Sequence, residues 1–156
     1  MDDLKRAAEA AHELGATRIR IFTFRRVADP AAIFDRVVEQ LQRAIAIARQ
    51  QDISLLVENE YDCNTATGEE IVQLLKAIPN KELMLNWDPC NCYEMGERPF
   101  PSVGNRLDHS RISHIHLKDA AGKEWRPIVR RDRLYWSIPC IEGNRIYRNS
   151  VSGDSL

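Results

Sequence analysis

Short apolar runs alternate along this chain with longer amphipathic stretches, and this alternation is what most constrains its fold. The short runs are rich in branched and aromatic residues and predict strands over residues 18–24, 53–58, 82–87 and 112–117. The amphipathic stretches place apolar residues at helical spacing and predict helices over residues 4–14, 29–48 and 67–78. Strands separated by helices pair in parallel, so the predicted class is α/β.

The spacing of the predicted strands narrows the architecture further. Their starts lie roughly 30 residues apart, which is the repeat of a (β/α)8 barrel of about 250 residues. A chain of 156 residues is too short for that barrel, so we expect a parallel (β/α) half-barrel, a fragment of a TIM barrel. A doubly wound sheet is the alternative, but neither G-x-G-x-x-G nor a P-loop occurs. Because the chain opens on a helix, we expect the front of the barrel to be absent.

Three predicted strands end in side chains that bind metals or move protons. These are Glu58, Asp88 and His116. The carboxyl ends of parallel barrel strands converge on one face, so the three side chains can reach a common point. Two carboxylates and an imidazole suit a hard divalent cation such as Mn2+ or Mg2+. The alternative is that each carboxylate caps the following helix.

Composition excludes several partners and locations. The chain has 22 Lys and Arg against 23 Asp and Glu, so nothing global attracts nucleic acid or an anionic membrane. No apolar run is long enough to span a bilayer and no signal peptide opens the chain, so the expected location is the cytoplasm. The four cysteines have no metal-site or disulfide spacing, so we expect reduced thiols.

The strand ends resemble those of a known superfamily. Leu55-Leu56-Val57-Glu58-Asn59, Asn86-Trp87-Asp88-Pro89-Cys90-Asn91 and His114-Ile115-His116-Leu117-Lys118-Asp119 look like the E-N, D-P-x-N and H-x-H-L-K-D motifs of the xylose isomerase-like TIM barrels. The group includes sugar-phosphate isomerases and epimerases, ketose 3-epimerases, inosose dehydratases and endonuclease IV-type repair enzymes. Order and spacing agree over about residues 4–127, and the strands resemble the fourth to seventh of the family.

The resemblance implies roles for individual residues. Glu58, Asp88 and His116 correspond to metal ligands, for Mn2+, Mg2+ or Co2+ rather than Zn2+. His116 is chosen over His114 because the family's imidazole immediately precedes L-x-D. Glu58 would also be catalytic, as one of two carboxylates that transfer a proton next to a metal-polarised carbonyl of a sugar or polyol.

Three further residues are expected near the substrate. These are His114, Asn91 and Lys118. His114 either contacts substrate or packs, and Lys118 either orients substrate or forms an ion pair or helix cap. The nuclease branch is disfavoured because only four histidines occur and Asn91 stands where that branch has one. Beside the isomerase or epimerase, the other alternative is a non-catalytic α/β remnant.

The family pattern stops after Pro127, so we divide the chain into residues 1–127 and an irregular tail, 128–156. The tail has five arginines, no lysine and no pattern of a seventh helix and eighth strand. Read one nucleotide later, degenerate codons for residues 140–156 permit A-L-K-E-T-G-Y-T-G-T-L-S-L-E-T-H, which resembles that eighth strand. We therefore hypothesise a frameshift near residue 128, which the coding DNA decides. An open half-barrel would either pair as a homodimer or aggregate.

Overall fold

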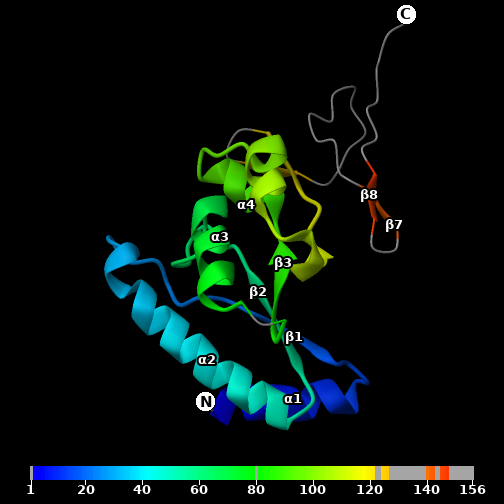
Figure 1. Cartoon of the computed structure of the whole chain (residues 1–156). Helices are drawn as coiled ribbons and strands as arrows, with labels where there is room; N and C mark the ends of the chain where they lie inside the picture. Colours follow the sequence, from blue (N-terminus) through cyan, green and yellow to red (C-terminus); the bar gives the residue numbers. More distant parts are fainter. Residues whose placement is uncertain (1, 80, 122–123, 127–139, 143–144, 148–156) are drawn as a thin grey trace, which may run out of the picture.

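A four-stranded parallel sheet organises the computed structural model, which describes residues 2–79, 81–121, 124–126, 140–142 and 145–147 (Figure 1). The strands run in the order β1 (Arg18–Ile21), β2 (Ser54–Glu58), β3 (Leu83–Trp87) and β4 (Ile112–Ile115). Each strand pairs in parallel with the next one along the chain. The predicted α/β class and parallel half-barrel are therefore confirmed.

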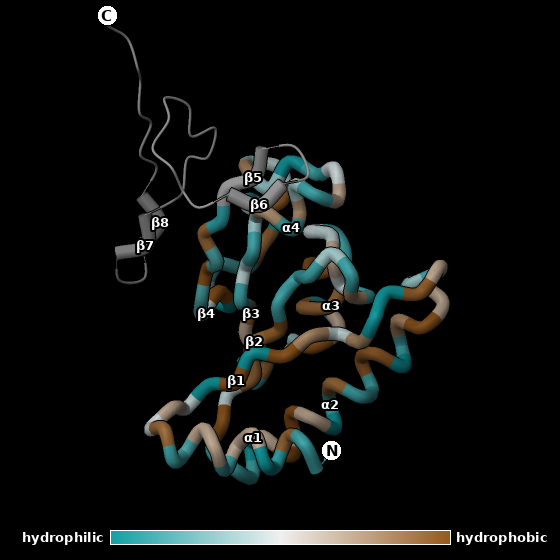
Figure 2. Tube along the Cα trace, turned by 180° about the vertical axis from the view of Figure 1, so that it is seen from behind, coloured by the Kyte–Doolittle hydropathy of each residue, from teal (hydrophilic) through white to brown (hydrophobic). Residues whose placement is uncertain are grey.

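Helices connect the strands and cover one face of the sheet. They are α1 (Asp2–Glu13), α2 (Phe34–Gln50), which follows the 3-10 turn η1 (Ala31–Ile33), and α3 (Gly68–Ala77). Alternate residues of β2 and β3, such as Leu55, Val57 and Leu85, are buried against these helices in one apolar core. The intervening residues, among them Glu58 and Asn86, point to the opposite face of the sheet because successive side chains of a strand alternate. Figure 2 shows the resulting hydropathy pattern along the trace.

The helix ends agree with the expected signals. Thr67 Oγ1 accepts the backbone N–H of Glu70 at 3.1 Å, and Glu70 Oε2 accepts the N–H of Thr67 at 2.9 Å. Together these two hydrogen bonds form a capping box. Gly15, after α1, has a positive φ of 69°, which glycine adopts without strain.

Several boundaries differ from the expectation, among them the end of β4, which is Ile115 and not residue 117. β1 ends at Ile21, so Phe22 and Phe24, predicted as strand, lie in the connection to α2. The connection after β3, for which the sequence predicted no helix, contains a short helix α4 (Pro89–Glu94) and three brief helical turns. These are η2 (Pro99–Val103), η3 (Gly104–Arg106) and η4 (His109–Arg111). Asp88 starts α4 because its side chain accepts two backbone N–H groups, with proline at the first helical position.

Short antiparallel pairs follow the parallel sheet. β5 (Asp119–Ala121) pairs with β6 (Glu124–Arg126), and β7 (Cys140–Glu142) pairs with β8 (Arg145–Tyr147). The second pair lies within residues 128–156, and the division of the chain at residue 127 with an irregular tail stays a prediction. Neither pair extends the parallel sheet. The remaining residues of 128–156 lie outside the described part, so the frameshift hypothesis stays a prediction.

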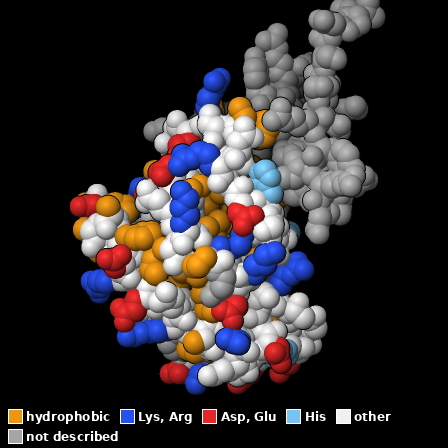
Figure 3. All heavy atoms as spheres, viewed as in Figure 1, with side chains coloured by type: hydrophobic (Ala, Val, Ile, Leu, Met, Phe, Trp, Pro, Cys, Tyr) orange, Lys and Arg blue, Asp and Glu red, His pale blue; other side chains and the backbone are white. Residues whose placement is uncertain are grey.

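Charged side chains of both signs are spread over the face shown in Figure 3, around a hydrophobic area near its middle. This mixture agrees with the balanced composition. None of the described helices combines the length and apolar character needed to cross a membrane.

Gly68, the first residue of α3, leaves no room for a side chain. A Cβ atom there would lie 2.1 Å from Val103 Cγ1 and 2.9 Å from Val103 Cβ. We expect Gly68→Ala to lower the free energy of unfolding by about 2 kcal/mol through this overpacking, measured by urea denaturation. Adding Val103→Ala should restore part of the loss. A double variant no more stable than Gly68→Ala would show that the clash is not the cause.

Candidate metal centre

Three ligand-type side chains meet where the carboxyl ends of β2, β3 and β4 lie together. Glu58 is the last residue of β2, Asp88 directly follows β3 and His116 directly follows β4. One donor atom from each lies within 4.8 Å of the others. Because parallel strands end at the same edge of the sheet, consecutive βα units bring these distant residues together. The structure thus brings the three predicted ligands to one point.

The imidazole of His116 bridges the two carboxylates. Its Nδ1 lies 2.9 Å from Glu58 Oε1 and 3.5 Å from Asp88 Oδ2. Both carboxylates are buried, whereas about a quarter of the His116 side chain is exposed. Buried carboxylates are costly unless cations or hydrogen bonds compensate their charge. Two of them beside an imidazole that remains accessible are a donor set that fits a divalent cation.

Two basic side chains of the chain itself compensate the carboxylates. Arg20 Nη1 lies 3.0 Å from Glu58 Oε2, and Lys118 Nζ lies 2.5 Å from Asp88 Oδ2. Burial lowers the pKa of Lys118, but its hydrogen bond to Asp88 and the nearby carboxylates outweigh burial, so the net pKa is raised. Of the roles expected for Lys118, the structure shows the ion pair.

Asn86 is a site residue that the sequence did not reveal. It lies opposite Glu58 in the β2–β3 register and is buried. Its Nδ2 lies 3.0 Å from Glu58 Oε2 and 3.2 Å from His116 Nε2, while its Oδ1 has no hydrogen-bond partner. The alternation of β3 was the available signal, because Asn86 is a polar residue on the face of the sheet that carries Glu58.

Asn59 fixes the distance between the ends of β2 and β3. Its Oδ1 accepts the backbone N–H of Asp88 at 2.8 Å, and its Nδ2 donates to the backbone carbonyl of Asp88 at 2.7 Å. The Asn91 side chain in turn donates to the carbonyl of Asn59 at 2.6 Å. All three residues are buried. The side chain of Asn59 therefore takes the place of a backbone pairing just past the end of the β2–β3 ladder, next to Glu58 and Asp88.

The other residues expected near the substrate lie in different surroundings. His114 is exposed, so it does not pack in the core, and its ring meets that of His116 edge-on at 5.4 Å. Asn91 is buried in the first turn of α4, and its amide donates to the β2–α3 connection. Contact of either residue with a substrate stays a prediction.

The described cysteines agree with the expectation of reduced thiols. Cys63, Cys90 and Cys92 are free and buried. Burial raises the pKa of Cys63 to about 11 and also raises that of Cys92. The thiols of Cys63 and Cys92 are therefore protonated at neutral pH and are poor metal ligands.

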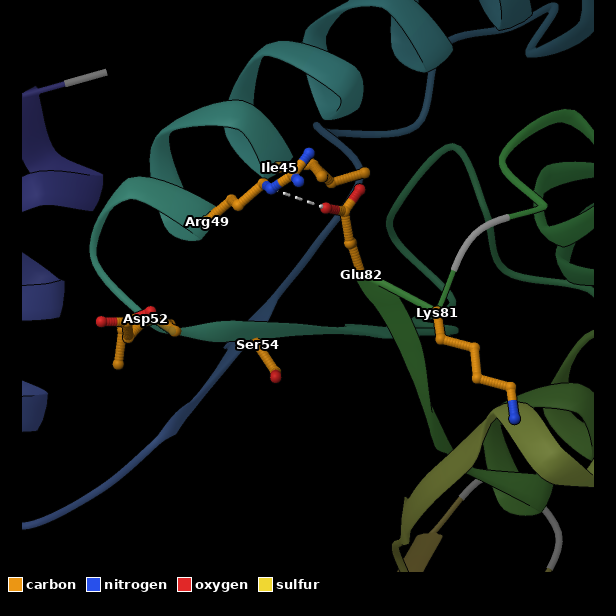
Figure 4. Close-up of a pocket in the computed structure, with 7 residues that line it drawn as sticks. Ile45, Arg49, Asp52, Ser54, Lys81 and Glu82 are labelled. Carbon is orange, nitrogen blue, oxygen red and sulfur yellow. Dashed lines mark ion pairs between the residues drawn. The ribbon is translucent and has the colours of Figure 1, made fainter.

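A hollow lies at the amino ends of the strands, opposite the end that carries Glu58, Asp88 and His116 (Figure 4). It has a volume of about 430 Å³ and lies beside the starts of β2 and β3. Arg49 and Glu82 pair across it at 3.4 Å, and its other charged lining residues are one base, Lys81, and one acid, Asp52. With no net charge and no cluster of ligands, this end lacks the chemistry of the carboxyl end.

The fold and the site together define a parallel βα barrel architecture with a carboxylate–histidine cluster at its carboxyl face. The chain belongs to the xylose isomerase-like TIM barrel family, whose model matches residues 1–133. No curated protein matches the sequence. The boundary that we placed at residue 127 stays a prediction.

Solved structures show the same fold at low sequence identity. The IOLI protein, with a bound zinc atom, is 17% identical with a TM-score of 0.66 over 76% of this chain and 43% of that one. A D-tagatose 3-epimerase-like protein is 21% identical with a TM-score of 0.62, over 76% and 47%. A xylose isomerase-like TIM barrel protein from Mycobacterium smegmatis, in complex with magnesium, is 21% identical with a TM-score of 0.61, over 75% and 44%. The chain therefore spans less than half the length of each.

Proposed function

We propose that this chain carries the metal-binding part of a sugar or sugar-phosphate isomerase or epimerase that depends on a divalent metal. The observation that carries the proposal is the convergence of Glu58, Asp88 and His116 at the carboxyl face. Membership of the xylose isomerase-like family supports it, as does the epimerase-like name of one structural relative. Because the chain spans less than half of these relatives, the proposed reaction is that of the complete site.

The proposed chemistry is proton transfer next to a carbonyl. A divalent ion held by the three side chains would polarise the carbonyl and hydroxyl oxygens of the substrate. Asp88, His116 and one Glu58 oxygen would hold the ion, while the other Glu58 oxygen would take or return the carbon-bound proton. Arg20 and Asn86 both donate to Glu58 Oε2, and these contacts orient the carboxylate. His114 and Lys118 are proposed to face the substrate.

Oxygen-rich ligands favour Mn2+, Mg2+ or Co2+ in this proposal. Zinc also belongs in the comparison, because one relative contains zinc and another contains magnesium. The proposed substrate is a small sugar or polyol and not a nucleic acid, in keeping with the mixed surface charge.

Isothermal titration of the chain with Mn2+ and Co2+ tests the proposal. We expect the titration to show one bound ion per chain. In a second experiment in D2O, NMR should show that the hydrogen next to a ketose carbonyl exchanges for deuterium only when the metal is present. Exchange that requires the metal separates an isomerase-type site from a non-catalytic remnant. Absence of metal binding would contradict the metal-centre proposal outright.

Asn59 should control the affinity of this centre from a distance. Asn59→Asp replaces the donor that faces the Asp88 carbonyl with an acceptor, so the Asp88 backbone should shift. We expect affinity for Mn2+ to fall about tenfold, as for other residues that orient metal ligands. Asn64→Ala is the control, because Asn64 is also a buried asparagine that holds backbone groups, but of the β1–α2 connection. Equal losses of affinity in both variants would count against a positioning role for Asn59.

A further inference from the structure

A pocket of about 540 Å³ lies beside the carboxyl ends of β1 and β2. Its walls contain Phe22, Phe24, Arg25, Glu60, Tyr61, Asp62 and Cys63. The exposed fractions of its three aromatic residues are 41% for Phe22, 54% for Phe24 and 46% for Tyr61. Three exposed aromatic side chains around one hollow are an apolar surface available to a ligand.

Phe24 is held in an unfavourable backbone conformation. Its φ is 31°, in the left-handed region that bulky residues avoid. Asn64 stabilises this conformation, because its Nδ2 donates to the carbonyls of Phe24 and Arg25 and its Oδ1 accepts the N–H of Val27. Arg26 adds a bond to the Cys63 carbonyl. The fold therefore holds a strained residue with its apolar ring exposed, a combination found at ligand sites rather than in loops that only connect.

Contacts at two places link this pocket to the metal centre. The Arg20 guanidinium lies over the Phe22 ring at 4.8 Å, and its Nη1 contacts Glu58 at 3.0 Å. On the other side, Glu60 Oε2 lies 3.5 Å from Asn91 Nδ2, and Asn91 is bonded to Asn59. Only one side chain therefore separates the pocket from Glu58, Asp88 and His116. A molecule bound at these three residues can reach into the aromatic pocket.

The charges of the pocket disfavour an anion. Arg25 is paired with Asp62 at 3.2 Å, which leaves the Glu60 carboxylate as the excess charge. A carboxylate accepts hydrogen bonds from hydroxyl groups but repels a phosphate. Aromatic faces beside hydrogen-bond acceptors match a molecule that has C–H faces and hydroxyl groups.

We propose that Phe22, Phe24 and Tyr61 form an aromatic platform that binds the C–H face of an uncharged sugar or polyol, while Glu60 accepts its hydroxyl groups. The proposal rests on the proposed function and narrows its substrate class, because it favours the free sugar over the sugar phosphate. The aromatic rings supply the contact area, and the neighbouring metal centre holds the reacting end of the same molecule.

Ligand-observed NMR titrations of the chain, with and without Mn2+, test the platform with myo-inositol, D-fructose and D-fructose 6-phosphate. We expect the uncharged probes to bind more tightly than the phosphate. Phe24→Ala and Tyr61→Ala should each weaken binding of the uncharged probes roughly tenfold. The control is Leu14→Ala, which shortens an exposed apolar residue at the other end of the sheet and should change nothing.

Phe24→Asn separates a binding role from a structural one. Asparagine tolerates a positive φ, so this variant should keep or raise the melting temperature while it loses the ring. Unchanged sugar affinity in Phe24→Asn, or tighter binding of the phosphate by the wild type, would overturn the platform. If the wild type binds no Mn2+, the proposed function fails, and the Phe24→Asn comparison without metal still decides the platform.

Discussion

Glu58→Gln is expected to lower the affinity of the chain for Mn2+ by about 100-fold or more. The change keeps the shape of the side chain but removes the negative charge that a divalent ion needs. It also places an amide beside Arg20 and Asn86, two groups that already donate to this position. Isothermal titration gives the affinity, and circular dichroism shows whether the fold is retained.

Two variants make this result specific. Glu94→Gln removes a carboxylate that interacts with Lys118 and Asp88 at the same end of the sheet but lies outside the ligand cluster. It should change the affinity less than threefold, as expected for a weak surface charge effect. His116→Ala removes a proposed ligand that is partly exposed, so the affinity for Mn2+ should fall with little loss of stability. If Glu94→Gln and Glu58→Gln lost affinity equally, binding would reflect general charge and not a site.

Arg111→Met is expected to destabilise the fold by about 3 kcal/mol, with a melting temperature lower by roughly 6–12 °C. Arg111 is buried, and its guanidinium donates to the carbonyl of Leu83 through Nε at 3.1 Å and Nη2 at 2.6 Å. Its Nη1 donates to the carbonyl of Leu75 at 3.0 Å. Leu75 lies in the last turn of α3, where carbonyls lack partners within the helix. Methionine fills the space but leaves both carbonyls without these donors.

Arg106→Met is the matched control for this change. Arg106 is half exposed and pairs with Glu69 on the surface, where solvent screens the ion pair and leaves it little effect on stability. Thermal denaturation of both variants compares the two arginines directly. Similar melting temperatures for them would show that the buried hydrogen bonds of Arg111 do not stabilise the junction between α3 and β3.

The sequence predicted the sheet and the ligand cluster for one shared reason. Apolar runs of the right length predict parallel strands, and polar residues at strand ends then fall on one edge, so Glu58, Asp88 and His116 could be placed together without coordinates. This prediction succeeded because the spacing of apolar and polar residues is a local property that can be read from the sequence. The helix ends marked by Gly15 and Thr67 were predictable for the same reason.

The features that could not be predicted depend on contacts between distant residues. Phe22 and Phe24 continue the alternation of β1, but hydrogen bonds from Asn64, about 40 positions away, hold this segment outside the strand. Asn86 and Asn59 act through hydrogen bonds across neighbouring strands, and an asparagine in a sequence carries no sign of its partner. Arg111 resembles any surface arginine until the fold buries it. The short helix α4 was not predicted, although the capping role left open for Asp88 is the one that starts it.

Hydrogen bonds connect the β1–α2 connection to the β2–α3 connection, and they should affect the rate of ligand binding. Asn64 and Arg26 bind both segments, so the aromatic side chains on them are preorganised. Ordering of flexible loops commonly opposes binding through lost entropy, and here that cost is small. A sugar should therefore associate in a single step, with a rate that does not level off at high sugar concentration.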